Sequence, residues 1–446
     1  MSTTATADRG ERLGDLSERR RRFLATTPGQ LRAESIAVVV SALVAGLLAS
    51  LVIADQAGST RRIADEAEPA ILNARQIQTS LAEANAAAAT AFLVGGVEDP
   101  VQRSTYESSL VMATQALEDA TRLVGEPPTV PAESEGLADP ATLSSNIVDY
   151  SGLIETARAN NRQGYPVGAA YLTEASALLE EEVYPQTDAL ANGAASRYLD
   201  SYNRQRGLAL VLGILAIVLV VVVVLMLVYV QFQLRRRFNR TLNLPLLAST
   251  LVAAGLALWM ASAMTSQLSH LTDARDDGYA GTRLYLDLRG TGFGAKADQA
   301  RFLIARGAGD GFNDDFEQRS AIIDGLRADF DLHAEDSDTP QAEELAVEAF
   351  AAWDSYAAVH QQIVAADDSG DRVAAVELAQ TEAGGSFERF DVATANALEA
   401  NDRQFEAEMN AAERATRWLR FGSLVAAVVV AGLAAYGIQL RIDEYR

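Results

Sequence analysis

Long apolar stretches and long polar segments follow one another along this chain. Four apolar stretches contain no acidic or basic residue, and they cover residues 36–54, 207–230, 244–263 and 421–440. Each stretch is long enough to cross the roughly 30 Å hydrocarbon core of a bilayer as a helix. Hydrocarbon offers no water to bond backbone groups, and the stretches lack the alternation of a membrane strand, so we expect four transmembrane helices.

The segments between the first and second spans (55–206) and between the third and fourth spans (264–420) are polar, alanine-rich and typical of helices. Turn signals divide each segment into four helices. These signals fall near 95–100, 125–140 and 164–166 in the first segment, and near 307–315, 333–340 and 367–371 in the second. We therefore predict two antiparallel four-helix bundles, each continuous with two spans.

The two polar segments also share local sequence. Ala91-Phe92-Leu93 corresponds to Arg301-Phe302-Leu303, and the turn at Gly164 corresponds to the turn at Gly370. An internal repeat of this length indicates a duplicated structural unit. The sequence thus predicts an all-α integral membrane protein, built as a tandem repeat of span, extracytoplasmic four-helix bundle and span.

We expect the two halves to pack as a pseudo-dimer about an axis along the membrane normal. Small residues recur at every fourth position of the first and third spans, which lets helices approach closely in lipid. The residues predicted to make this contact are Ser41, Ala45, Ala49, Ser249, Ala253 and Ala257.

Arginines flank the spans on one predicted side, in the lead 1–35, the loop 231–243 and the tail 441–446. Short basic segments stay in the cytoplasm, so we expect a multi-pass cell-membrane protein with both termini cytoplasmic. We expect this basic rim to contact anionic lipid or an acidic cytosolic partner. Its residues are Arg19, Arg20, Arg21, Arg22, Arg235, Arg236, Arg237 and Arg240.

Composition limits the chemistry. The formal net charge of −23 argues against a nucleic-acid partner, and with no cysteine the bundles must be held by packing alone. His270, His333 and His360 lie far apart without metal-ligand spacing, so we expect no catalytic residue, metal or cofactor. Lys296, the only lysine, indicates a biased genome composition. The glycines of 290–294 lack the context of a phosphate loop and favour close helix contact or a bend.

The pattern of Arg301-Phe302-Leu303 with its glycine-aspartate turn, and of Gly370-Asp371 leading into Thr381-Glu382-Ala383, resembles the four-helix-bundle sensor domains of bacterial chemoreceptors and sensor kinases. The resemblance implies that both outer segments are sensor bundles. Chemoreceptors continue past the last span into a HAMP linker and a coiled coil, whereas only 441–446 follow here. We therefore expect the effector to be a separate protein.

The whole layout is similar to that of actinobacterial four-span relay proteins, which link a glutamine/glutamate-binding lipoprotein outside to the soluble serine/threonine protein kinase G inside. The resemblance implies no enzymatic activity and a role in amino-acid sensing for nitrogen and central metabolism. It also implies two partners, an extracytoplasmic solute-binding lipoprotein and a cytosolic serine/threonine kinase. Further oligomerisation stays open. We expect the lipoprotein to contact membrane-distal turns, at Pro127, Pro128, Pro131, Asp310 and Asp314.

Two other functions stay open. A direct small-molecule sensor of the chemoreceptor type would need a pocket in the bundles, with carboxylate-binding arginines on the helices that leave the membrane. The candidates are Arg61, Arg62, Arg75, Arg275, Arg283 and Arg289. A membrane scaffold would need no response to a ligand. Binding of free amino acids by the outer segments would favour a direct sensor over a relay.

Overall fold

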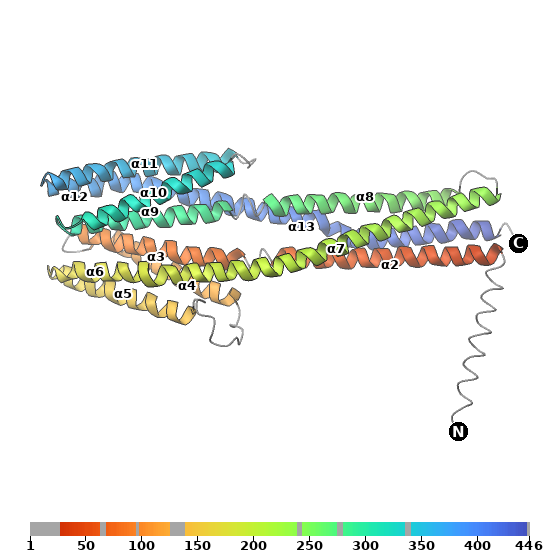
Figure 1. Cartoon of the computed structure of the whole chain (residues 1–446), viewed down its shortest axis with the longest axis horizontal. Coiled ribbons are helices and arrows are strands. Elements are labelled where there is room, and N and C mark those ends of the chain that lie inside the picture. The colour runs from red at the N-terminus through yellow and green to blue at the C-terminus, as the bar shows by residue number, and fades with distance from the viewer. Residues whose placement is uncertain are drawn as a thin grey trace, which may run out of the picture. The chain divides into compact units, whose positions relative to one another are not determined.

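The computed structural model describes residues 27–62, 68–94, 98–124, 139–238, 243–273, 280–334 and 340–443. All regular elements in these ranges are helices, which confirms the all-α prediction (Figure 1). The chain divides into two compact units. The membrane unit comprises Met1–Arg61, Tyr202–His270 and Asn410–Arg446, and the bundle unit comprises Arg62–Ser201 and Leu271–Met409.

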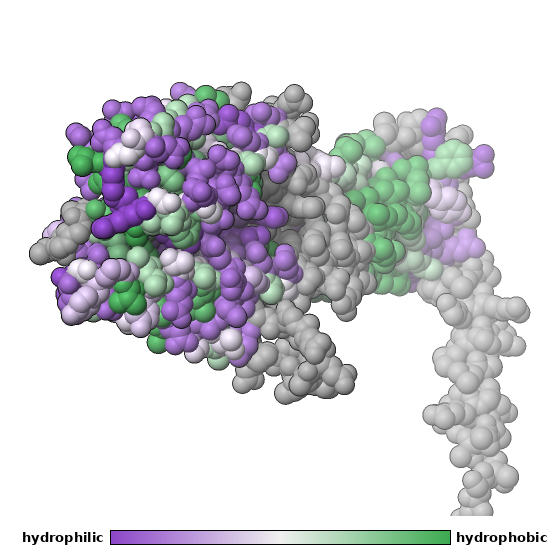
Figure 2. Space-filling model, turned by 60° about the vertical axis from the view of Figure 1, so that its left-hand side comes forward, coloured by the Kyte–Doolittle hydropathy of each residue, from purple (hydrophilic) through white to green (hydrophobic). Residues whose placement is uncertain are grey.

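The membrane unit contains four helical segments that are long and apolar enough to cross a bilayer. They belong to α2 (Thr27–Arg62), the later part of α7 (Tyr184–Phe238), α8 (Leu244–Asp273) and the later part of α13 (Gly384–Asp443). Apolar side chains such as Leu51, Leu258 and Val425 are exposed on them. Figure 2 shows the resulting hydrophobic surface of this unit, which matches a lipid environment.

Small residues bring the helices of the membrane unit together. A Cβ added at Gly46 of α2 would collide with Ala427 of α13, and the Ser249 hydroxyl of α8 donates to the Val430 carbonyl of α13 at 3.0 Å. Of the predicted span contacts, Ala45, Ala49, Ser249 and Ala253 are buried, while Ser41 and Ala257 are half-buried. These close contacts of α2 and α8 are with α13, so packing of the first span on the third stays a prediction.

The bundle unit has the same order of helices in its two halves. The first half comprises α3 (Glu68–Val94), α4 (Pro100–Val124), α5 (Pro140–Arg162), α6 (Val167–Leu178), the π-helix η2 (Leu179–Val183) and the start of α7. The second half comprises α9 (Ala280–Ile304), α10 (Asp310–Ala334), α11 (Pro340–Asp368), α12 (Arg372–Leu378), the π-helix η4 (Ala379–Ala383) and the start of α13.

Local sequence explains where helices end. Gly164 and Gly370 have φ values of 73° and 83°, which glycine adopts without steric cost, and they end α5 and α11. The Asp371 carboxylate then accepts from the Ala374 backbone N–H at 3.1 Å and caps α12. Both glycines lie at predicted turns.

Antiparallel packing sets where α4 ends. Because α3 and α4 run in opposite directions, α4 ends at the same end of the bundle unit as α3 begins (Figure 1). The predicted contact residues Pro127, Pro128 and Pro131 lie outside the described residues, so an outer partner contact there stays a prediction.

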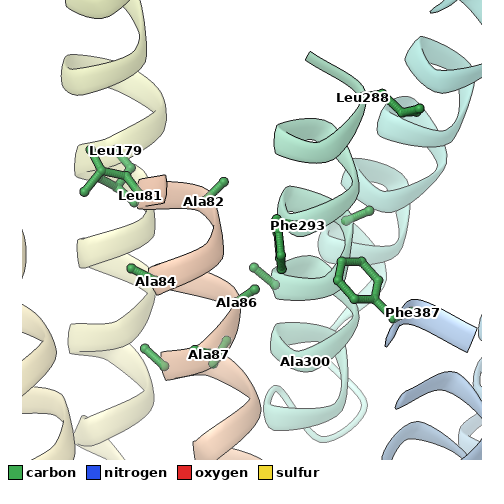
Figure 3. Close-up of a cluster of buried hydrophobic side chains, with 14 of the residues drawn as sticks. Leu81, Ala82, Ala84, Ala86, Ala87, Leu179, Leu288, Phe293, Ala300 and Phe387 are labelled. Atoms are coloured by element: carbon green, nitrogen blue, oxygen red, sulfur yellow. The ribbon is translucent and has the colours of Figure 1, made fainter. Parts of the chain in front are cut away.

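The two halves meet along α3 and α9. The Thr79 hydroxyl of α3 donates to the Leu286 carbonyl of α9 at 3.1 Å. Close approach is possible because Gly290 of α9 has no side chain, and a Cβ there would lie 3.3 Å from Thr79 Oγ1. Figure 3 shows Ala86 and Ala87 of α3 near Phe293 and Ala300 of α9. Small residues thus join the halves into one core.

Candidate ligand-binding site

A cavity of about 540 Å³ opens between the two halves of the bundle unit. It is formed by α3 and the start of α4 from the first half, and by α9, α11, η4 and the start of α13 from the second. Its volume is in the range of small-molecule sites in proteins. We call it the inter-half pocket.

Lys296 of α9 supplies the positive charge of the pocket. Its ammonium lies 4.4 Å from the ring centroid of Phe387, a favourable cation–π distance. Among the described residues, no carboxylate oxygen lies within 4.0 Å of the Lys296 ammonium, the distance that defines an ion pair. Burial lowers the pKa of Lys296 below its ordinary value, partly offset by Asp391, Glu83 and Glu388. Its three N–H donors are therefore not used by a protein carboxylate.

Carboxylates from both halves face the same cavity. Glu83 and Asp99 come from the first half, and Glu388 and Asp391 come from the second. Asp391 accepts from Arg289 Nε at 2.7 Å, while Glu83 Oε1 lies 3.7 Å from Arg289 Nη2. The described lining is negative overall, because Lys296 is the only cation among the described lining residues.

Two buried polar atoms of the lining lack a hydrogen-bond partner in the described protein. They are Glu83 Oε2 and the hydroxyl of Tyr356, and both side chains are at least nine-tenths buried. Burial raises the pKa of Glu83, although Arg289 opposes the shift. Since buried polar groups in folded proteins are nearly always bonded, these two atoms are unsatisfied hydrogen-bonding groups in the wall of the pocket.

The π-helix η4 forms one wall through Ala379, Gln380 and Ala383, followed by Gly384 and Phe387 of α13. π-Helical turns are rare and frequently occur at functional sites. A Cβ added at Gly384 would meet only the Ala379 carbonyl, at 3.8 Å, so this glycine leaves space open.

The other π-helix, η2, faces a different arrangement. Glu180 of η2 accepts from Arg319 Nη2 at 2.8 Å and from Arg301 Nη2 at 3.2 Å. Arg319 Nε donates to Asp298 at 2.7 Å, and Arg301 also pairs with Asp298. Asp298 is fully buried. These four residues, the ion quartet, pair with one another across the two halves, and Arg301 Nε is the one buried quartet atom without a hydrogen-bond partner in the described protein.

Burial affects two groups that border these sites. It raises the pKa of Tyr184, which directly follows η2 and feels the charges of Arg319 and Glu180. It lowers the pKa of His360 to about 4. The neutral His360 ring is hydrogen-bonded to Gln299, a pocket residue, at 3.2 Å and stacks on Phe316. His360 therefore supports the pocket wall as an uncharged core residue.

The structure places the predicted sensor arginines in ion pairs. Arg75 pairs with Asp188 at 2.6 Å, Arg283 lies 3.7 Å from Asp287, and Arg289 pairs with Asp391. Of these three, only Arg289 holds a carboxylate that lines the pocket. The side chains of Arg61 and Arg62, and the whole of Arg275, lie outside the described residues.

The predicted partner contacts are only partly described. Arg235 and Arg236 are exposed near the end of α7, and the Arg236 guanidinium lies 4.6 Å over the Phe232 ring. Asp310 and Asp314 are exposed at the start of α10. The remaining residues of the basic rim lie outside the residues whose side chains the structure describes: Arg19, Arg20, Arg21, Arg22, Arg237 and Arg240.

Sequence reasoning missed Lys296, Glu83 and Tyr356 as site residues. The available signal was Lys296 itself, a single lysine in an arginine-rich chain, placed on a stretch rich in glycine, alanine and phenylalanine. A stretch of this composition predicts that the lysine is buried, and a buried ammonium needs a compensating interaction.

Comparison with known proteins gives one match. Residues 59–203 match the family model described as the Actinobacterial sensor domain. Neither the curated proteins nor the solved structures compared with the chain gave a match. The matched range contains α3 to α6, η2 and the start of α7, and hence the first-half wall of the pocket. The family match and the four candidate spans together support a membrane protein with a sensing role.

Proposed function

We propose that this protein is a non-enzymatic membrane sensor that binds a small molecule directly in the inter-half pocket. The observation that carries the proposal is the set of unpartnered polar groups in that cavity, Lys296, Glu83 Oε2 and the Tyr356 hydroxyl. A cavity of about 540 Å³ with a few convergent polar groups is the usual form of a ligand site.

We also propose that the two halves are copies of one unit, so that a single chain corresponds to a dimer of ordinary sensors. The shared order of helices, including a π-helix before α7 and before α13, supports this duplication. The α3–α9 contact then joins equivalent helices. In such an arrangement the pocket lies between copies, where relative movement of the halves changes its shape.

The proposed signal leaves through α13. This helix begins at the pocket wall with Gly384 and Phe387 and ends at Asp443, after the fourth span. A ligand that shifts η4 and the start of α13 would thereby act on a membrane helix, as in known switching transitions that slide or rotate helices. The cytoplasmic receiver proposed from the relay resemblance is a serine/threonine kinase at the basic rim.

The test is direct binding to the full chain in lipid nanodiscs. Isothermal titration with the twenty amino acids and a set of small dicarboxylates and amines should give saturable binding by at least one compound. Lys296→Gln should abolish that heat, while the exposed Arg122→Gln should not. A relay without its own ligand would instead give no heat with any small molecule, and would bind a solute-loaded lipoprotein.

A further inference from the structure

We infer that the pocket takes a small zwitterion, a molecule of the α-amino-acid class that carries one carboxylate and one ammonium group. The inference rests on the proposed sensor function and specifies its ligand. It is carried by the two opposite kinds of unsatisfied group that line one cavity.

The Lys296 ammonium and the Tyr356 hydroxyl are hydrogen-bond donors that a ligand could satisfy with an acceptor. The Lys296 ammonium makes a cation–π contact with Phe387, and an aromatic face accepts no conventional hydrogen bond. Tyr356 as a whole is 1 % exposed, and its buried hydroxyl has no hydrogen-bond partner in the described protein. A carboxylate offers two acceptor oxygens and a negative charge, so it satisfies an ammonium and a hydroxyl together.

The carboxylates that line the pocket are acceptors that a ligand could satisfy with a hydrogen-bond donor and a positive charge. Glu83 Oε2 has no hydrogen-bond partner, and its closest cation, Arg289, is already bonded to Asp391. Asp99 and Glu388 add negative charge to the lining. A purely anionic ligand would enter a negative cavity at a cost, because like charges at short range repel.

The remaining lining restricts the body of the ligand. Phe293, Phe387 and Ala87 form apolar surface, and Gln299 and Gln380 offer amides. A compact molecule with a short side chain therefore fits better than a long polyamine, which would leave Lys296 beside a second cation. A dicarboxylate would satisfy Lys296 and leave Glu83 without a donor.

The experiment compares three matched probes on the nanodisc-embedded chain. The first is whichever of L-alanine, L-serine, L-glutamine and L-glutamate binds most tightly. The second is its α-amide, which lacks the carboxylate, and the third is its α-hydroxy acid, which lacks the ammonium. We expect each analogue to bind at least tenfold more weakly than the amino acid.

Two substitutions assign the charges. Lys296→Gln should weaken the amino acid at least tenfold and change the α-amide by less than threefold. Glu83→Gln should weaken the amino acid and spare the α-hydroxy acid. Lys296→Arg keeps the charge and should retain part of the affinity, which separates charge from folding. Thermal unfolding by circular dichroism verifies that each variant is folded.

The outcomes separate the ligand class from the sensor function. If an amine without a carboxylate, or a dicarboxylate, binds as tightly as any amino acid and responds to Lys296→Gln, the zwitterion inference is wrong and the sensor proposal stands. If no small molecule binds the folded chain, both are wrong. Binding of an amino acid that is insensitive to both Lys296→Gln and Glu83→Gln also overturns the inference.

Discussion

The ion quartet and the inter-half pocket both lie between the two halves, yet one is filled and the other is open. In the proposed duplication, Glu180 of η2 corresponds to Gln380 of η4, and Tyr184 corresponds to Gly384. By the alignment of Phe92 with Phe302, the positions of Asp298, Arg301 and Arg319 correspond to Ala88, Ala91 and Ser109. Large charged groups thus close one side, and small residues leave space on the other.

If the halves are copies, as we propose, the difference teaches how a duplicated bundle can lose one of two equivalent sites. A single chain is free to change each half separately, unlike a symmetric homodimer in which every substitution occurs twice. The quartet side pairs its charges internally, whereas on the pocket side, among the described residues, Lys296 has no carboxylate within 4.0 Å and Glu83 has only the 3.7 Å contact with Arg289. We therefore expect one ligand for each chain.

The largest effect is expected from opening the quartet. Arg319→Ser places there the residue that the first half has at Ser109, and it removes one bond to the half-buried Glu180 and one to the buried Asp298, which both keep Arg301 as a partner. Removing one partner from a buried ion-pair group costs up to about 3–5 kcal/mol. Urea unfolding of the nanodisc-embedded chain, followed by the fluorescence of buried Trp353 in a background without Trp259 and Trp418, measures this loss.

The matched control for this experiment is Arg122→Ser. Arg122 is exposed and pairs with Glu118 at 2.8 Å on the same helix. Exposed pairs contribute about 0.2–1 kcal/mol. A loss for Arg319→Ser no larger than that of the control would mean that the quartet is not a satisfied counterpart of the pocket.

The next largest effect is expected from closing the pocket. Gly384→Tyr puts the quartet-side residue, Tyr184, into the open site, where a Cβ meets only the Ala379 carbonyl. The ring should fill the ligand space and weaken amino-acid binding about 100-fold, or about 2.7 kcal/mol. Titration calorimetry measures the affinity, and circular dichroism verifies the helical content.

Gly385→Tyr is the neighbouring control, since Gly385 has no atom within 4 Å of an added Cβ and does not line the pocket. It should bind the amino acid like the unaltered protein. Equal affinity in the two tyrosine variants would show that ligand does not enter beside Gly384.

The sequence allowed the helices to be predicted but not this contrast. Apolar periodicity and turns such as Gly164 and Gly370 are local signals, so the all-α fold and the helix order follow from them. The pocket depends on residues from α3, α4, α9, α11, η4 and α13 meeting, among them Glu83, Lys296 and Phe387. No local pattern specifies that meeting, and the charge of Arg289 was visible while its bond to Asp391 was not.

Binding should depend on pH in two limbs, one set by Glu83 and one set by Lys296. Burial raises the pKa of Glu83 above its ordinary 4.5 and lowers the pKa of Lys296 below its ordinary 10.5. Ligand binding needs the Glu83 carboxylate and the Lys296 ammonium, so affinity should fall as pH drops through the first pKa and as pH rises through the second. Each limb approaches about tenfold per pH unit.

Charged neighbours of these two groups are Arg289 on α9, and Glu388 and Asp391 on α13. Lys296→Arg should move the alkaline limb to higher pH, because a guanidinium stays protonated. An alkaline limb that stays in place would assign it to the ammonium of the amino acid itself. The pH dependence of the stability that the ion quartet contributes supplies the comparison with the pocket, because the charges of the quartet are paired with one another and need no ligand.

The smallest effect is expected from giving the pocket the charge of the quartet. Gln380→Glu introduces the residue that stands at Glu180, but Gln380 is exposed, so the added charge acts through solvent. At about 4 Å in water such a charge contributes about 1 kcal/mol, or roughly fivefold in affinity. The added negative charge should strengthen binding of the α-amide and weaken binding of the α-hydroxy acid. For the zwitterion, its effects on the ammonium and on the carboxylate nearly cancel.

Because exposed charges are screened over about 3 Å at 1 M salt, high salt should remove the difference in affinity between the two analogues. A difference that persists in high salt would indicate that Gln380 contacts the ligand directly, and the comparison of open and closed sites would then extend to η4 itself.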